Sequence, residues 1–75
     1  MKVSIKTEFI PLDALLKYAD ILPSGGVTKI LLAEGTVTVN DVQIHERRKK
    51  IYPGDIVSIN WPSEELAIQL EVEKE

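Results

Sequence analysis

The sequence predicts a single α+β domain in which two helices near the N-terminus pack on a small antiparallel sheet. Three observations support this class. A chain of 75 residues is long enough for one domain and too short for two. Apolar side chains recur at helical spacing over residues 12–34, whereas they alternate with polar side chains in the flanking segments. The composition, with 44% hydrophobic and 28% charged residues, is that of a folded globular protein.

Residues 2–9 form the first expected element, an N-terminal strand with polar and charged side chains on one face. Its apolar face carries Val3, Ile5 and Phe9. Pro11 then suits the first turn of a helix, because its missing N–H would have no hydrogen-bond partner there.

A first helix is predicted to follow and to end before Pro23. Asp13 and Lys17 stand four residues apart, in the order that favours an ion pair on the outer face of a helix. The inner face is an apolar stripe of Leu12, Leu15, Leu16, Ala19 and Leu22.

A second helix is predicted over residues 27–34, with Ser24 as its N-cap and Gly35 closing it in a left-handed conformation. The short break between the two helices predicts a tight helix-turn-helix unit. The side chains expected to face the core are Ile30, Leu31 and Ala33.

A β-hairpin is predicted after Gly35. Residues 36–39 and 42–45 both alternate between polar and apolar side chains. Asn40 and Asp41 stand between them, and both residue types tolerate the positive φ that a tight hairpin turn requires.

The last third of the sequence predicts two further strands. Residues 46–50 form a loop, and the Pro-Gly-Asp turn of residues 53–55 leads into a strand over residues 56–61. After a turn beginning at Pro62, residues 66–73 alternate as a final strand with an acidic outer face.

The two parts of the chain carry opposite net charge. Over the whole chain the balance is −3, with nine Lys and Arg against twelve Asp and Glu. Residues 1–50 hold eight of the cations and six acids, a net of +2, whereas residues 51–75 have a net of −5. A polyanion responds to the local field at the surface that it contacts, so the total charge does not exclude nucleic acid.

The four consecutive cations of residues 47–50 are dense enough to displace counterions from a phosphate backbone, although a solvated loop is the alternative reading of these residues alone. Lys17 and Lys29 add charge from the two helices. The backbone N–H groups of Gly25 and Gly26, beside the start of the second helix, suit an anion, although a plain turn is the commoner role of such a pair. The predicted phosphate-binding face consists of Lys17, Ser24, Gly25, Gly26, Lys29, Arg47, Arg48, Lys49 and Lys50.

Two aromatic residues are candidates for stacking on unpaired bases. Tyr52 is the better candidate because it lies between the basic residues and the Pro-Gly-Asp turn. Trp61 shares a strand face with Val57 and Ile59, so we expect it to pack at the core or its rim.

The sequence argues against catalysis and against a metal or cofactor. No cysteine is present, which excludes a disulfide and a thiolate zinc site and fits a reducing compartment. His45 is the single histidine, and we expect it on the surface rather than at a metal site. No Ser or Thr has a base at a recognisable spacing, so a non-enzyme is expected. The sequence shows neither a signal-peptide pattern nor the roughly 20 apolar residues of a membrane span, which makes the cytoplasm the expected location.

Several motifs occur in an informative order: LDALLK at residues 12–17, Ser24 and Lys29, AEGTVTVN at residues 33–40, and PGD at residues 53–55. This succession resembles the S4 RNA-binding domain, which is found in a ribosomal small-subunit protein, pseudouridine synthases and tyrosyl-tRNA synthetases. The resemblance covers about residues 10–60, out of 75. The length is most similar to the small stand-alone bacterial members of the family, of the YaaA kind.

The resemblance implies the S4-type (alpha-L) fold, with two helices packed on a small, strongly bent sheet. It further implies that the helical face and the adjoining loop lie on the sugar-phosphate backbone of structured RNA. Ribosomal RNA is the implied partner, ribosome assembly or translation is the implied process, and ribosomal proteins are a further class of partner.

The chain departs from the family pattern at three places. Pro11 stands where an arginine is usual, and Gly25 and Gly26 stand where a basic residue is usual. These two departures leave more of the phosphate binding to Lys29 and to the basic run that follows the hairpin. The hairpin turn also has Asp41 in place of the usual glycine.

Small β-grasp proteins, such as sulfur carriers and ubiquitin-like modifiers, are a competing resemblance, because they also place a helix before a Val-Asn strand and a Gly-Asp turn. Their chemistry needs a free Gly-Gly C-terminus, whereas this sequence ends in EVEKE. A protein-interaction module without RNA binding, whose acidic last strand contacts a basic partner, remains the alternative.

Overall fold

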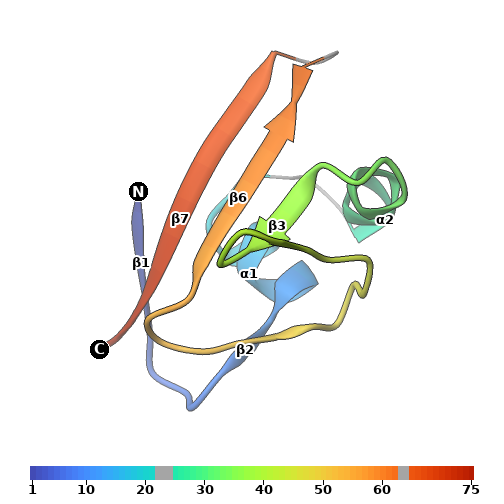
Figure 1. Ribbon diagram of the computed structural model, residues 1–75. Helices are drawn as coiled ribbons and strands as arrows, with labels where there is room; N and C mark the ends of the chain where they lie inside the picture. Colours follow the sequence, from blue (N-terminus) through green and yellow to red (C-terminus); the bar gives the residue numbers. More distant parts are fainter. Residues whose placement is uncertain (22–24, 63–64) are drawn as a thin grey trace.

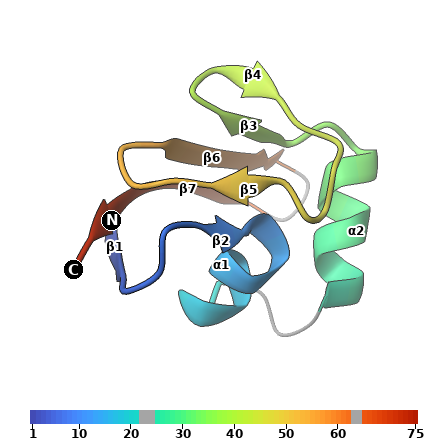
Figure 2. The same ribbon diagram turned by 90° about the horizontal axis from the view of Figure 1, so that it is seen from below.

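The computed structural model describes residues 1–21, 25–62 and 65–75. Two helices pack beneath a five-stranded sheet, and a two-stranded ribbon runs beside them (Figure 1 and Figure 2). The helices are α1 (Leu12–Tyr18) and α2 (Gly25–Ala33). The sheet has the order β1-β7-β6-β3-β4, with β1 at Lys2–Ile5, β3 at Val37–Val39, β4 at Val42–Gln43, β6 at Ile56–Trp61 and β7 at Leu66–Lys74. The ribbon pairs β2 (Ile10–Pro11) with β5 (Lys50–Ile51).

The sheet is mixed, which corrects the expected antiparallel sheet. Strand β1 lies parallel to β7, with Val3 beside Val72, whereas the pairings of β3 with β4 and β6, and of β6 with β7, are antiparallel. Alternation of apolar residues fixes which face of a strand is buried, but it does not fix the direction of the neighbouring strand. The parallel pairing of the first and last strands at this edge of the sheet therefore could not be predicted from their patterns.

The N-terminal strand is shorter than predicted, because it ends at Ile5 instead of Phe9. The hydroxyl of Thr7 donates to the carbonyl of Phe9 at 2.7 Å, within the turn that leads the chain from β1 to β2. Pro11 has φ −62° and ψ 145° and precedes the first helical residue, so its expected place in the first turn is wrong by one position. It pairs across the ribbon with Lys50 instead.

Helix α1 ends at Tyr18, well before Pro23, and this also corrects the prediction. Asp20 adopts the left-handed conformation with φ 58° and donates its N–H to the carbonyl of Lys17. The N–H of Ile21 donates to the carbonyl of Leu16 at 3.0 Å. These two hydrogen bonds form a Schellman motif, which satisfies the last carbonyls of a helix and stops its propagation.

Helix α2 begins at Gly25, two residues earlier than predicted, and the expected N-cap Ser24 and the apolar Leu22 lie outside the described residues. It ends at Ala33, one residue before the predicted end, and Gly35 closes it in the predicted left-handed conformation, with φ 70° and the N–H of Thr36 donating to the carbonyl of Leu31. Its inner face differs in part from the expected one: over residues 28–33, Ile30 and Ala33 are exposed, whereas Thr28, Leu31 and Leu32 are buried.

The predicted hairpin is confirmed. Asn40 and Asp41 have φ values of 51° and 68°, the pair of positive angles that defines a type I′ turn, and Thr38 pairs with Gln43 across it. The returning strand β4 covers only Val42–Gln43, so the expected strand over residues 42–45 is shorter. Ile44 still donates its N–H to the carbonyl of Val37 at 3.0 Å.

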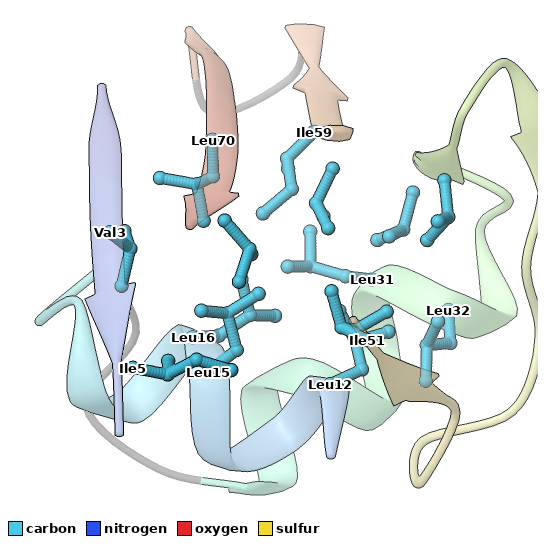
Figure 3. Close-up of a cluster of buried hydrophobic side chains, with 14 residues drawn as sticks. Val3, Ile5, Leu12, Leu15, Leu16, Leu31, Leu32, Ile51, Ile59 and Leu70 are labelled. Carbon is cyan, nitrogen blue, oxygen red and sulfur yellow. The ribbon is translucent and has the colours of Figure 1, made fainter. Parts of the chain in front are cut away.

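A hydrophobic core fills the space between the sheet and the helices (Figure 3). The predicted alternation of the last strand is confirmed, because Leu70 and Val72 are buried while Gln69 and Glu71 are exposed. Ile51 brings the ribbon into the same core at 0% exposure. Among the residues whose burial is described, the side chains that form the core are Val3, Ile5, Leu12, Leu15, Leu16, Leu31, Leu32, Val37, Val39, Ile51, Val57, Ile59, Leu70 and Val72.

Candidate nucleic-acid interface

The basic loop, defined as residues 47–50, is fastened to the start of α1. The backbone N–H of Leu12 donates to the carbonyl of Lys49 at 2.9 Å, and the N–H of Asp13 donates to the carbonyl of Arg47 at 3.0 Å. The strand pairing of Lys50 with Pro11 continues this contact into the ribbon, and Figure 2 shows the β4–β5 connection passing the first turn of α1. The backbone of the loop is therefore held in place by α1 and β2.

The N-terminus of α1 is not free to bind a phosphate. The first N–H groups of a helix have no partner within the helix, and here the basic loop supplies carbonyls to the first two of them. The third, of Ala14, donates to Oδ1 of Asp13 at 2.9 Å. An anion that binds at this end of the domain would therefore meet side chains instead of these backbone N–H groups.

Those side chains are accessible, and one of them is paired. Arg48 and Lys50 are exposed, Lys49 is half-buried, and the side chain of Arg47 is 49% exposed. The Nε of Arg47 lies 3.8 Å from Oδ2 of Asp13. Asp13 was expected to pair with Lys17 along the helix, and the structure places it against the basic loop instead. An exposed ion pair of this kind contributes little stability, but it offsets part of the charge of Arg47.

Lys17 lies at the same surface as the basic loop. It lines a hollow of about 340 Å³ together with Arg48, and residues at the start of α1, including Ala14, also line this hollow. The predicted association of Lys17 with the loop therefore has a structural basis. Asp13 also lines the hollow, so this part of the surface carries one carboxylate between the cations.

An aromatic pair adjoins the loop on its other side. The ring of Tyr52, which is 43% exposed, lies with its centroid 5.8 Å from that of Phe9 at an interplanar angle of 46°. The Nζ of Lys50 lies 4.9 Å from the centroid of the Phe9 ring, a cation–π distance. Sequence reasoning missed Phe9, because alternation alone assigned it to the apolar face of the first strand. Pairing of β2 with β5 brings it to the loop, and no local pattern indicates that pairing.

The remaining predicted site residues lie on α2 or before it. Lys29 is exposed on α2, an element separate from the basic loop. Gly25 and Gly26 form the first turn of this helix, where backbone N–H groups lack intrahelical partners. Ser24 is outside the described residues. That these positions meet the same ligand as the basic loop stays a prediction.

His45 and Trp61 lie away from the predicted phosphate contacts. His45 is exposed, although it follows β4 instead of belonging to a strand. Trp61 packs against the edge of the core, as expected. Among residues 1–21, 25–62 and 65–75, no three His, Asp or Glu side chains gather in a metal-binding group. Within the same described part, neither helix is long and apolar enough to cross a membrane.

Comparison with known proteins identifies the family. Residues 3–69 match the S4 domain family. The chain belongs to the S4 domain family. The match extends beyond the residues that carry the motifs, because it includes most of β1 and the first part of β7. The S4 domain seen here is thus an arrangement of two helices and a mixed sheet, and the resemblance to this family is confirmed.

A curated relative supports the assignment to small S4 proteins. The chain is 47% identical over 57 residues to the probable ribosome maturation protein RlbA of Bacillus subtilis (strain 168). The aligned region covers 76% of this chain and 80% of the relative. No solved structure gives a significant match.

Proposed function

We propose that this protein is a non-enzymatic RNA-binding module of the cytoplasm, which recognises structured RNA through phosphate contacts and acts in ribosome assembly or translation. Ribosomal RNA is the proposed target, and the name of the B. subtilis relative, a probable ribosome maturation protein, supports this choice. The observation that carries the proposal is the basic loop, whose backbone is fastened to α1 while the side chains of Arg48 and Lys50 remain exposed.

A fastened loop suits phosphate binding for an entropic reason. Ordering a flexible backbone costs about 1–2 kcal/mol per residue, and a loop that is already hydrogen-bonded to a helix avoids most of that cost on binding. The cations proposed to contact phosphates are Arg47, Arg48, Lys49 and Lys50, with Lys17 from α1 and Lys29 from α2 in support. Contacts to phosphates carry no information about the base sequence. We therefore expect the four cations of the basic loop to recognise the shape of a double helix or junction.

The distribution of acids is consistent with one binding side. Glu71 projects from the outer face of β7, which is opposite to the face that packs on the helices. Its neighbour across the parallel pairing is Lys2, and the next residue outward on that face is Glu73, which accepts a hydrogen bond from the hydroxyl of Ser4 at 3.1 Å. A polyanion approaching this face would meet carboxylates, so RNA is expected at the loop.

Interaction with a protein is the second candidate function. The outer face of β7 carries exposed Gln69 and Glu71 and has no helix packed on it among the described residues. An acidic, uncovered strand face of this kind fits a basic protein partner, such as a ribosomal protein. In this reading the domain binds its protein partner through this face and does not bind RNA.

The test is recovery of crosslinked RNA from cells that express the tagged full chain. The variant R48Q/K50Q removes two exposed cations from the loop, and K6Q/K74Q removes two exposed cations near the chain ends as a charge-matched control. Loss of two phosphate contacts lowers affinity by roughly tenfold or more at physiological salt. We expect a defined structured RNA with the wild type and the control, and its loss with R48Q/K50Q. Equal recovery with both variants would remove the loop from the site, and recovery of protein without RNA would favour the second function.

A further inference from the structure

A second hollow lies beside the basic loop, between the β3–β4 hairpin and β5. It has a volume of about 300 Å³ and combines apolar with cationic side chains. The apolar side comes from Val39, Val42 and Ile44, and the rim comes from Lys49, Lys50 and Tyr52. Val42, in β4, is 62% exposed, and Tyr52, which directly follows β5, is 43% exposed, so both side chains are accessible to a ligand.

We propose that this hollow, the hairpin hollow, binds one unstacked nucleotide of the RNA. This inference rests on the proposed function, because the nucleotide belongs to the same RNA whose phosphates contact the basic loop. The base would lie against Tyr52 and the apolar side chains of Val42 and Ile44. The adjoining phosphate would lie at Lys49 and Lys50, which belong to the basic loop and also line the hairpin hollow.

The chemistry of the lining fits a nucleotide better than a purely apolar ligand. Aromatic and apolar side chains take the face of a base, and cations at the edge take its phosphate. Tyr52 is held in place for this role, because its ring packs on Phe9 and its N–H donates to Oδ2 of Asp55 at 2.8 Å. A stacking surface that is already ordered loses less conformational entropy on binding.

The carboxylate of Asp55 fixes the orientation of the nucleotide. Asp55 lines the hollow on the side of the hairpin turn, where Asn40 donates to its Oδ1 at 3.0 Å. A phosphate would be repelled from this side, whereas the N–H groups at the edge of a base would not. The phosphate is therefore expected at the lysine side and the base edge at the Asp55 side.

The experiment compares two RNA probes, a plain duplex of about 20 base pairs and the same duplex with one unpaired adenosine. Stacking of one base on an aromatic side chain is worth about 1–3 kcal/mol, which corresponds to a preference of at least about fivefold for the bulged duplex. Affinities are measured by fluorescence anisotropy with the full chain. We expect Tyr52→Ala to bring the ratio of the two affinities to about one and Tyr52→Phe to keep the wild-type ratio.

A second variant addresses the apolar side of the hollow. Val42→Glu places a carboxylate where the nucleotide would lie, and the variant should fold as the wild type does because the Val42 side chain is 62% exposed. It should abolish the preference for the bulge. Replacement of the unpaired adenosine by 2-aminopurine adds a direct readout, since stacking on Tyr52 quenches its fluorescence in the wild type and in Tyr52→Phe but not in Tyr52→Ala.

The outcomes separate this inference from the proposed function. Equal affinity of the wild type for both duplexes would overturn the hairpin hollow and leave phosphate binding by the loop intact. A preference for the bulge that persists in Tyr52→Ala would also overturn it, because the RNA shape alone would then cause the preference. Binding to neither duplex would overturn both the hollow and the recognition of RNA helices by the loop.

Discussion

The side-chain amide of Asn40 donates to Oδ1 of Asp55 at 3.0 Å and thereby joins the hairpin turn to the turn that precedes β6. The carbonyl oxygen of the same amide accepts the N–H of Ile56 at 2.9 Å. The backbone N–H of Asn40 also donates to the carbonyl of Ile56, at 2.8 Å. Two motifs that are fifteen residues apart in the sequence therefore form one hydrogen-bonded unit, which explains why Val-Asn and Pro-Gly-Asp occur together in this chain.

Removal of the Asn40 side chain tests this unit. Asn40→Gly keeps the positive φ but loses both side-chain hydrogen bonds, so the free energy of unfolding should fall by about 1–2 kcal/mol. Asn40→Ala should cost roughly 1 kcal/mol more, because alanine is strained at the observed φ of 51°. Urea denaturation of both variants measures the difference. An alanine variant as stable as the glycine variant would contradict the contribution of φ.

Asp13→Asn should strengthen RNA binding. The carboxylate lies 3.8 Å from Arg47, and the asparagine oxygen can still accept the N–H of Ala14. Removal of one negative charge from the surface should raise the affinity for an RNA duplex by about two- to fivefold, with a stability change below about 1 kcal/mol. Glu71→Gln makes the same charge change on the opposite face of the sheet and should leave affinity nearly unchanged. A weaker affinity for Asp13→Asn would mean that the ion pair positions Arg47 for binding.

Gly35→Ala should destabilise the domain for two separable reasons. Gly35 has φ 70°, and an added Cβ would meet the side-chain amide of Gln43, which donates to the carbonyl of Gly35 at 3.0 Å. The backbone strain should lower the free energy of unfolding by roughly 1–2 kcal/mol, and displacement of the Gln43 amide should lower it further. In a Gln43→Ala background only the strain should remain. Gly54→Ala, with φ 98° and open space around the added atom, is the matched control for strain alone.

Ile51→Ala should lower the free energy of unfolding more than the substitution of any exposed residue near the basic loop. The side chain is fully buried and links the β2–β5 ribbon to the core, so its truncation should cost about 2–5 kcal/mol. Thermal unfolding followed by circular dichroism measures the loss. Ile56→Ala is the control, because Ile56 is 37% exposed and should lose about 1 kcal/mol or less. Similar losses for both would show that the ribbon is not part of the cooperative core.

RNA binding should depend steeply on salt. Four or five phosphate contacts predict a slope of the logarithm of affinity against the logarithm of salt concentration of roughly −3 to −4.5, with the value of ~0.9 per phosphate for duplex DNA as the upper guide. Titrations between low and physiological salt measure it, and Arg48→Gln should reduce the slope by about 1. A slope near zero would contradict recognition by phosphate contacts.

Features that depend on a single backbone position could be predicted from the sequence. Gly35 and Asn40 have the positive φ that their residue types favour. The closure of α2 by Gly35 and the hairpin turn were therefore predicted correctly. Asp20 has a similar φ and was missed, because aspartate also occurs within helices and nothing nearby distinguishes the two roles. The end of the first helix was therefore placed too late.

The cations of the candidate site could be predicted from the sequence, but the contacts that hold them in place could not. The basic loop was visible as a run of four cations, but its attachment to α1 uses backbone N–H and carbonyl groups, for which side-chain patterns carry no information. Asp13 was assigned to a neighbour four residues away along the helix, whereas its partner Arg47 comes from a segment that only the tertiary fold brings close. The contact of Phe9 with Tyr52 was missed for the same reason.

The parallel pairing of β1 with β7 has a consequence for the order in which the protein folds. Val3 pairs with Val72, so residues as far along the chain as Val72 must be synthesised before this edge of the sheet can form. Contacts that span so many residues raise the contact order and slow folding relative to a helical protein of the same length. The helices and the β3–β4 hairpin, which are local, can form while the polypeptide is still growing, but the sheet that buries their apolar faces is completed only by its last strand.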